Sequence, residues 1–472
     1  MMEKEVDCMP RVLVIAHLFP PIGGIGVQRA LKFTQYLSEY GWSPVVLTTS
    51  DFHVATMDPS LLEKVPASVP VYRTADRMAR WMARISPVSA HAAKTSENFS
   101  AKPTKRSFKQ RLLPMLKTLR NTLAIPDEQL LWAISAAFAA RHVIRKEQID
   151  CVFTTSGPNS AHIAGYLLKR WLGIPWVADF RDPWTDNMHF PDEGVRAVVE
   201  RALERCVLKT ADALITVTDS FASLFKHKHP SVPGKIHVIR NGVDPADFPI
   251  VTPDHHTSHQ TLAGERPFTL LYAGILYPKR SPEIFLRALQ RAIASGAIQR
   301  EQIRIEFAGV FDYPAPVSNS QLLKELDLED VVQPLGYLSH DEVAKRMLQV
   351  DGLLLIGDAD ERAGMYIPGK VYEYLYARKP VFALLQPGEA AKLLEQFQVG
   401  VVAPVEDEEK VFQALCVYCN EFIQNWSGGP NEQDLLIFSR QYEAQLLADV
   451  LTETLQPWLL ERNRSQSAWA VQ

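Results

Sequence analysis

The sequence predicts an α/β protein built from two Rossmann-like, doubly wound parallel-sheet domains that face a cleft. Two series of short apolar strands, each followed by an amphipathic helical stretch, lead to this prediction. Such alternation in both halves of a chain is typical of βαβ units, whose strands lie parallel. With 472 residues, of which 47% are hydrophobic, the chain is long enough to bury two separate cores.

Composition restricts the classes of partner. A net charge of -4 offers no general electrostatic reason to bind nucleic acid. Five cysteines, few and odd in number, favour a reducing compartment. Cys416 and Cys419 have a spacing typical of metal ligands, but no second pair of Cys or His lies nearby in the sequence, so we interpret them as helix packing and expect no metal cofactor.

The chain shows neither a signal peptide nor a membrane-spanning segment. Its first residues are charged and lack an apolar core. Apolar runs elsewhere are shorter than a bilayer requires. We therefore expect a cytoplasmic protein, or one bound to a membrane only at its surface, which would be the inner face of the plasma membrane.

The first domain, expected over residues 1–247, opens with a buried strand from Arg11 and a turn rich in proline and glycine. A helix from Arg29 to Tyr40 follows. Glycines let the backbone approach a ligand closely, and a helix N-terminus offers N–H groups to an anion. A tight turn without a ligand uses the same residues. The expected anion-binding residues are Gly23, Gly24 and Gly26.

A basic insertion is expected at residues 73–120, where Asp76 and Glu97 are the only acidic residues among many Lys and Arg. Apolar residues between the charges would form one face of each of two helices. A basic amphipathic pair suits the surface of an anionic membrane, where each cation contributes about 1 kcal/mol. The alternative is a solvated insertion that packs on its own domain.

Three charged residues follow a buried strand that begins at Trp176. Asp179, Arg181 and Asp182 come where the strand ends, and side chains there project into the ligand crevice of a doubly wound sheet. Charges in such a place need partners, which a substrate can supply. Mutual ion pairing is the structural alternative.

The second domain is expected over residues 268–443, after a polar linker at 248–267. Its first strand is followed by a loop with Lys279 and Arg280, where cations could meet a diphosphate. A C-terminal helical segment, residues 444–472, could cross back to the first domain.

A loop, a short helix and a strand between Tyr366 and Leu384 carry one well-placed carboxylate. A helix that starts near Lys370 would place Glu373 in its first turn and Arg378 and Lys379 in its last. Because this helix begins at the ligand edge of the sheet, Glu373 could accept hydrogen bonds from the ribose of a nucleotide sugar. Alternatively, Glu373 pairs only with Lys370.

Three segments resemble the family 4 glycosyltransferases, retaining enzymes of GT-B fold that move a sugar from a nucleotide sugar to an acceptor. They are the turn from Phe19 to Gly26, Ile239-Arg-Asn-Gly-Val-Asp244 and Gly369-Lys-Val-Tyr-Glu-Tyr-Leu375. The resemblance covers nearly the whole chain. It implies a metal-independent hexosyltransferase with a nucleotide sugar, a UDP-sugar by analogy, as co-substrate and a glycan or polyprenyl-linked acceptor in polysaccharide biosynthesis.

The resemblance also implies roles for single residues. The glycines of the first turn would approach the donor phosphates, Arg280 or Lys279 would neutralise the diphosphate, and Glu373 would hold the ribose. Taken with the residue patterns above, the expected catalytic residues are Arg181, Asp182 and Arg280, and the expected substrate-binding residues are Gly23, Gly24, Gly26, Asp179, Asn241, Lys279, Gly369, Lys370 and Glu373.

The chain departs from the family at three positions. Met365 stands where many members have a first Glu that contacts the donor sugar, and Glu361 could replace it only in a shifted loop. Ile275 and Arg181 stand where a basic residue and a His are common. These departures keep two alternatives open, a GT-B sugar-nucleotide epimerase and a nucleotide-sugar-binding protein without turnover.

The basic insertion yields a prediction for membrane binding. If residues 73–120 lie on a bilayer, the protein co-sediments with anionic vesicles and less so as salt screens an attraction that reaches about 8 Å at physiological ionic strength. Changing Lys105, Arg106, Lys109 and Arg111 to Gln releases it without altering nucleotide affinity. Equal sedimentation on neutral and anionic vesicles, or none on either, would contradict the membrane role.

Overall fold

A computed structural model describes residues 9–51, 57–76, 125–188, 190, 193–248, 266–312 and 318–469. The chain divides into two compact units, which are described separately below. The first comprises Met1–Val217, Phe221–Ile239 and Glu443–Gln472, and the second Thr218–Ser220 and Arg240–Tyr442. The main division lies between Ile239 and Arg240, whereas the sequence placed the end of the first domain at residue 247. Most of the predicted basic insertion and linker lies outside the described residues.

The described part of the first unit contains a seven-stranded parallel sheet of order β3-β2-β1-β4-β5-β6-β7. Leu13 of β1 aligns with Val45 on one side and Val152 on the other. Apolar residues fill both faces of the sheet, as expected for parallel strands covered by helices. The strands are β1 Arg11–Ile15, β2 Ser43–Thr49, β3 Val71–Thr74, β4 Cys151–Thr155, β5 Trp176–Phe180, β6 Ala213–Thr216 and β7 Ile236–Val238.

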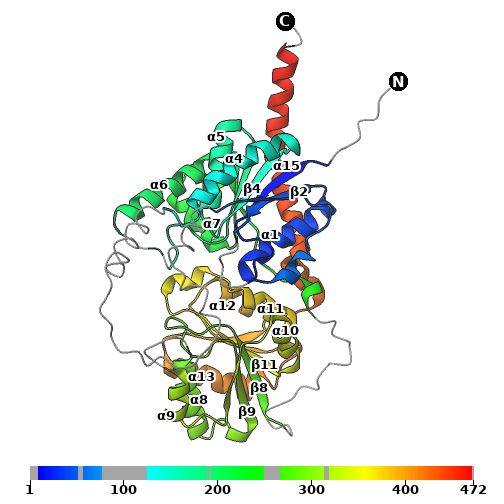
Figure 1. Cartoon of the computed structure of the whole chain (residues 1–472). Coiled ribbons are helices and arrows are strands. Elements are labelled where there is room, and N and C mark those ends of the chain that lie inside the picture. The colour runs from blue at the N-terminus through cyan, green and yellow to red at the C-terminus, as the bar shows by residue number, and fades with distance from the viewer. Residues whose placement is uncertain are drawn as a thin grey trace, which may run out of the picture. The chain divides into compact units, whose positions relative to one another are not determined.

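Helices cover both faces of this sheet (Figure 1). The first begins at Ile25, earlier than the expected Arg29, because Gly24 takes the N-cap position with φ 92°, a backbone conformation that L side chains rarely adopt. A 3-10 turn, Leu37–Tyr40, then ends at Gly41. The helices are α1 Ile25–Tyr36, α4 Leu130–Lys146, α5 Ser160–Leu172, α6 Val195–Thr210, α7 Asp219–Lys228 and α15 Arg440–Trp469.

The C-terminal helix α15 joins the first unit from Glu443 onward. Its apolar residues, among them Leu447 and Leu451, pack in one core with strands β1 and β4. The indole of Trp42 donates a hydrogen bond to Thr452 Oγ1 at 3.1 Å. A segment more than four hundred residues from β1 in the sequence therefore completes the core of the first unit (Figure 1).

The described part of the second unit contains a six-stranded parallel sheet of order β10-β9-β8-β11-β12-β13. One apolar core lies on each face of it. The predicted fold class of two Rossmann-like parallel-sheet domains is thereby confirmed. The strands are β8 Phe268–Ala273, β9 Ile303–Ala308, β10 Val332–Gly336, β11 Gly352–Ile356, β12 Val381–Leu384 and β13 Gly400–Ala403.

The helices of the second unit alternate with its strands. Cys419 is buried in one of the two cores, beside Tyr418. Within the described ranges, no group of three or more His, Cys, Asp or Glu side chains is arranged to hold a metal ion. The helices are α8 Glu283–Ala294, α9 Asn319–Glu325, α10 His340–Gln349, α11 Gly369–Ala377, α12 Glu389–Gln396, α13 Glu408–Val417 and α14 Glu432–Leu435.

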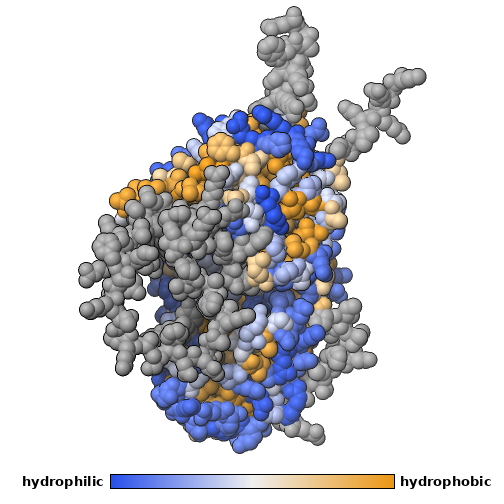
Figure 2. Space-filling model, in the orientation of Figure 1, coloured by the Kyte–Doolittle hydropathy of each residue, from blue (hydrophilic) through white to orange (hydrophobic). Residues whose placement is uncertain are grey.

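The surface of the first unit carries apolar side chains on α6. Val195 is 82% exposed, and Val198 and Val199 are also exposed. Figure 2 shows hydrophobic residues on the surface in this region.

Across the residues that the structure describes, no helix combines the length and the apolar character that a membrane span requires.

A buried ion pair joins α1 to β5. Arg29 donates from Nε and Nη2 to the two carboxylate oxygens of Asp179, each at 2.9 Å, and both side chains are almost fully buried. Thr155 on β4 donates to the same carboxylate at 2.7 Å. Arg29 also donates to the carbonyl oxygen of Ile239 and lies 3.7 Å from the carboxylate of Glu443. These contacts connect segments from five parts of the chain.

This ion pair gives a stability prediction. Changing Asp179 to Asn leaves the buried guanidinium of Arg29 without its main counter-charge, so the free energy of unfolding falls by about 3–5 kcal/mol. Urea denaturation followed by tryptophan fluorescence measures it. In the matched control, Asp330→Asn breaks the exposed pair with Arg300 and costs at most about 1 kcal/mol. An equal decrease in the free energy of unfolding in both variants would show that the buried pair stabilises the fold no more than the exposed one.

Candidate functional site

Each sheet has one point where the strand order reverses. In the first unit it lies between β1 and β4, and in the second between β8 and β11. Loops leave neighbouring strands in opposite directions at such a point, so the carboxyl ends of these strands form the ligand crevice of a doubly wound sheet. The charged residues and glycines that the sequence analysis identified lie at or near the carboxyl ends of the strands in these two sheets.

In the first unit, the glycine turn between β1 and α1 is held by Arg181. Its Nη1 donates to the carbonyl oxygen of Gly26 at 2.7 Å, and its backbone N–H donates to Ser156 Oγ at 2.9 Å. A Cβ at position 26 would lie 2.7 Å from the side chain of Leu18. The first turn of α1 has no side-chain cap, and the backbone N–H of Val27 donates to the carbonyl oxygen of Gly24 at 3.3 Å.

The three charged residues at the end of β5, of which Asp179 lies in the strand, differ in their surroundings. Asp179 has its partners inside the protein, Arg29 and Thr155, whereas the sequence interpretation expected a substrate to supply them. The structural alternative of ion pairing therefore describes Asp179, although its partner is Arg29 and not Arg181. Arg181 contacts the glycine turn, and Asp182 is exposed. For all three residues a substrate contact stays a prediction.

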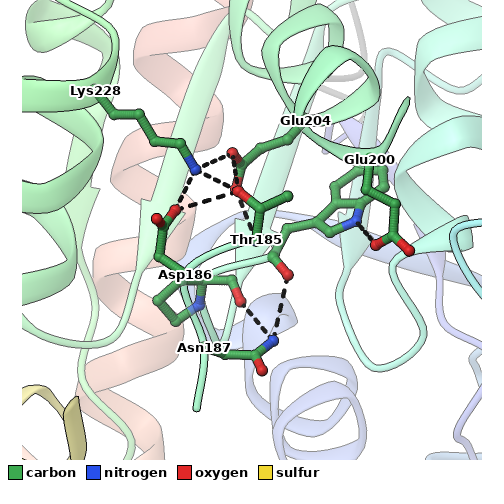
Figure 3. A network of polar contacts seen from close by, with 8 residues as sticks. Thr185, Asp186, Asn187, Glu200, Glu204 and Lys228 are labelled. Carbon is green, nitrogen blue, oxygen red and sulfur yellow. Dashed lines mark hydrogen bonds and ion pairs between the residues drawn. The ribbon is translucent and has the colours of Figure 1, made fainter. Parts of the chain in front are cut away.

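A polar network anchors the chain directly after Asp182. The ammonium of Lys228 on α7 donates to Thr185, Asp186 and Glu204, the last at 2.5 Å (Figure 3). The indole of Trp184 donates to Glu200 at 3.0 Å. Burial would raise the pKa of Glu204, but hydrogen bonds and the charge of Lys228 outweigh burial and lower it. The segment that carries Arg181 is thus attached to α6 and α7.

In the second unit, an ion pair spans the point where the strand order reverses. Arg280, in the loop after β8, donates from Nη2 to Asp358, after β11, at 2.8 Å. The guanidinium lies 5.0 Å from the ring centre of Tyr277, and burial raises the pKa of that phenol to about 12. Arg280 Nε and Asp358 Oδ1 are buried without a hydrogen-bond partner. Tyr272 also interacts with Arg280, and Tyr277 with Asp358, so the pair lies among two phenol groups.

A second carboxylate lies beside this pair. Asp360 accepts from Arg362 Nε at 3.1 Å and lies 3.4 Å from Lys279 Nζ. The backbone N–H of Ala359 donates to the carbonyl oxygen of Lys279 at 2.8 Å. Asp358 and Asp360 thus pair with three cations that come from two loops.

The loops at this edge approach each other closely through glycine. Gly309, after β9, has φ 125°, and a Cβ there would lie 2.0 Å from the carbonyl oxygen of Gly274, after β8. No other residue type fits without moving the backbone. Ile275, at the position where related proteins often carry a basic residue, presents an apolar side chain that is 52% exposed.

Helix α11 positions Glu373 differently from the prediction. The helix begins at Gly369 with Pro368 as N-cap, so Glu373 lies beyond the first turn. Arg378 is the C-cap, with a left-handed backbone, so Arg378 and Lys379 follow the helix and do not form its last turn. The prediction failed because the helix ended one residue before the basic pair.

The carboxylate of Glu373 lies between two cationic groups. Lys370 Nζ is 2.7 Å from Oε2, and His340 Nε2, at the start of α10, is 3.7 Å from Oε1. Burial would raise the pKa of Glu373, but His340 and Lys370 outweigh burial and lower it. The same interaction raises the pKa of His340. The alternative pairing with Lys370 is therefore present, and a ribose contact stays a prediction.

Two further positions complete the site predictions. Asn241 is half-buried in the segment between β7 and the 3-10 turn Pro245–Asp247. Met365 ends the 3-10 turn Glu361–Met365, which precedes α11. The sequence interpretation missed His340 and Arg362 as neighbours of the site. His340 lies 33 residues from Glu373, so no local spacing connects them, whereas Arg362 adjoins the acidic run and could have been found there.

Comparison with known proteins supports the resemblance. Residues 99–247 match the family model described as Glycosyltransferase Family 4. A D-inositol 3-phosphate glycosyltransferase of Nocardioides sp. is 27% identical over 203 residues, 39% of this chain and 43% of that protein. A probable glycosyltransferase WbjE of Pseudomonas aeruginosa is 20% identical over 332 residues, which cover 69% of this chain and 78% of that protein. The chain thus spans less than half of the Nocardioides relative. The predicted resemblance to family 4 glycosyltransferases is confirmed.

Solved structures share the fold over the whole chain. A glycosyltransferase from Rickettsia africae superposes with a TM-score of 0.58 at 13% identity, covering 94% of this chain and 98% of that one. Anabaena Alr3699/HepE, solved with UDP and glucose, gives a TM-score of 0.54 at 14% identity and covers 97% and 100%. At these identities the likeness concerns the fold, which is the GT-B fold of glycosyltransferases.

The pair of His340 and Glu373 gives a pH prediction. Because the pKa of His340 is raised, its stabilising contribution is complete below the unfolded value of about 6.5 and is lost as pH rises through the folded value. Lys370 lowers this pKa and Asp247 raises it. His340→Gln therefore costs stability at pH 5.5 but little at pH 8.5. The side chain is 56% exposed, so screening keeps the cost below about 1 kcal/mol.

Urea denaturation at the two pH values measures this difference. In the Glu373→Gln background the effect of His340→Gln loses most of its dependence on pH, because the carboxylate that most favours the protonated imidazole is gone. A cost that is equal at both pH values in the wild-type background would show that the pair does not control the protonation of His340.

Proposed function

We propose that this relative of the family 4 glycosyltransferases is a retaining hexosyltransferase, which moves a sugar from a nucleotide sugar to an acceptor. The observation that carries the proposal is the group of cations where the strand order of the second unit reverses, with Arg280 paired to Asp358 across it. Such an edge is where doubly wound sheets bind nucleotides. Cations there suit the diphosphate of a donor.

Arg280 is the proposed catalytic cation. When the bond from sugar to diphosphate breaks, negative charge grows on the leaving group, and a fixed guanidinium stabilises it. The surroundings of Arg280 favour this task, since its Nη2 donates to Asp358 and its buried Nε has no hydrogen-bond partner in the protein. Protein cations supply the positive charge in this proposal, so the reaction requires no metal ion.

Glu373 is the proposed contact for the donor ribose. Its lowered pKa keeps the carboxylate ionised, and an ionised carboxylate is a strong acceptor for hydroxyl groups. Gly369 and Lys370 begin the same helix, and Lys370 orients the carboxylate. Met365 offers no carboxylate for the donor sugar, so we infer that other groups contact it.

The nature of the substrates rests on the relatives. Anabaena Alr3699/HepE was solved with UDP and glucose, which favours a UDP-sugar as the donor here. The glycines of the first unit are proposed to approach the donor phosphates. Arg181 supports them by donating a hydrogen bond to the carbonyl oxygen of Gly26. A glycan or polyprenyl-linked acceptor, reached at the cytoplasmic face of the membrane through residues 73–120, completes the proposal.

The experiment that tests this function incubates the purified protein with radiolabelled UDP-, GDP- and ADP-sugars, with and without a polyprenyl-diphosphate-linked acceptor, in buffer with EDTA. Transfer of label to the acceptor with retention at the anomeric carbon is expected. Release of an epimeric sugar without acceptor would identify an epimerase. Binding without any product would identify a nucleotide-sugar-binding protein.

The role of Arg280 gives a prediction for turnover. Arg280→Gln lowers kcat by about 100-fold or more, because the cation acts on charge that develops in the transition state. Since the change also leaves the buried Asp358 unpaired, the double variant Arg280→Gln/Asp358→Asn is needed. It recovers the melting temperature without recovering turnover.

The matched control is Arg287→Gln. Arg287 forms an exposed pair with Glu283 on α8, so its loss removes a cation of the same type from outside the site. Its turnover stays at the wild-type level. Recovery of turnover together with stability in the double variant would show that Arg280 acts on the fold alone.

A further inference from the structure

Two ion pairs join the loop after β8 to the loop after β11. Asp358 and Asp360 stand two residues apart on one loop, and each contacts a cation of the other loop, Arg280 and Lys279. Between these two contacts lies the backbone hydrogen bond from Ala359 to Lys279. The two loops are therefore held together at the edge where the sheet binds ligands.

Arg362 adds the third cation. Asp360 accepts from its Nε at 3.1 Å, its Nη2 at 3.2 Å and its backbone N–H at 3.1 Å. Arg362 is the main cause that holds the pKa of Asp360 far below its usual range, so this carboxylate is ionised at all working pH values. Lys279, Arg280 and Arg362 thus bring three cations to the carboxylates of Asp358 and Asp360.

Arg362 comes from the loop after β11, whereas Lys279 and Arg280 come from the loop after β8. Directly after Gly274 the chain presents Ile275, an exposed apolar side chain that cannot attract a phosphate. The side chain of Arg362 is 34% exposed and comes from the opposite loop. Its contact with Asp360 fixes the guanidinium in one orientation, which lowers the entropy cost of binding an anion.

We propose that Arg362 is a second diphosphate-binding cation for the donor and that Asp360 is the residue that positions it together with Lys279. This inference rests on the proposed function, whose donor supplies the diphosphate. A guanidinium recognises phosphate oxygens through paired N–H groups, and a cation beside Arg280 divides the charge of the leaving diphosphate between two loops.

A purely structural role for Arg362 would have a different signature. A pair between residues two apart in an exposed turn contributes about 0–1 kcal/mol to stability. Losing it would change melting slightly and affect all ligands equally. A phosphate-binding role weakens only ligands that carry phosphate, and most strongly those that carry two.

The test compares binding of nucleotides that differ only in phosphate. UDP, GDP and ADP are titrated into the wild-type protein by calorimetry, and the tightest is followed by its monophosphate and its nucleoside, measured by ligand-observed NMR. Arg362→Gln is expected to weaken the diphosphate at least tenfold, the monophosphate less and the nucleoside not at all. Arg287→Gln changes none of them, and Arg362→Lys recovers part of the loss.

Asp360→Asn separates positioning from simple repulsion. Removing a carboxylate near an anion site strengthens anion binding if only charge matters, whereas loss of positioning weakens it. We expect weaker binding of the diphosphate in Asp360→Asn, with a melting temperature close to that of the wild type. Stronger binding would overturn the positioning role.

The outcomes also distinguish this inference from the function on which it rests. Wild-type protein that binds no nucleoside diphosphate would overturn the proposed function and the inference with it. Wild-type binding with unchanged diphosphate affinity in Arg362→Gln, or with equal loss for diphosphate and nucleoside, would overturn the inference alone.

Discussion

The buried ion pair between Arg29 and Asp179 is the constraint on which the first unit depends. A guanidinium taken out of water is stable only where protein groups replace its hydration, and here the carboxylate of Asp179 and the carbonyl oxygen of Ile239 do so. The carboxylate of Glu443 adds a weaker contact. Helix α1, strand β5, the end of β7 and helix α15 must therefore occupy fixed positions before this charge can be buried.

The same ion pair connects the core to the candidate site. Arg29 reaches from α1 to β5, and Arg181, two residues after Asp179, reaches back to the turn before α1. Each element thus donates an arginine to the other, and the glycine turn is held against the edge of the sheet. In the second unit the ion pairs of Arg280 and Arg362 are partly exposed, where water and a ligand can compete for the cations. The first arrangement favours rigidity and the second exchange of partners.

Local patterns in the sequence were sufficient for the elements and for the fold class. Apolar runs such as Trp176–Phe180 predicted parallel strands because each is buried on both faces. Glycine and proline marked the loops at the ligand edge, and Lys279, Arg280 and Glu373 were found from their places after strands or near helix starts. Helix ends were less accurate, as Gly24 and Arg378 show, because a cap depends on the backbone conformation of one residue.

The sequence by itself therefore determined the two parallel-sheet units, the ligand edges and the residue types that line them, because these follow from periodicities of a few residues. Only the tertiary structure decided which charged residues form ion pairs with each other. Asp179 pairs with a residue 150 positions away, Arg280 with one 78 positions away, and Glu373 with His340 from another helix. Such pairs depend on strand order and crossover connections, which bring distant segments to one edge, and no local spacing encodes them.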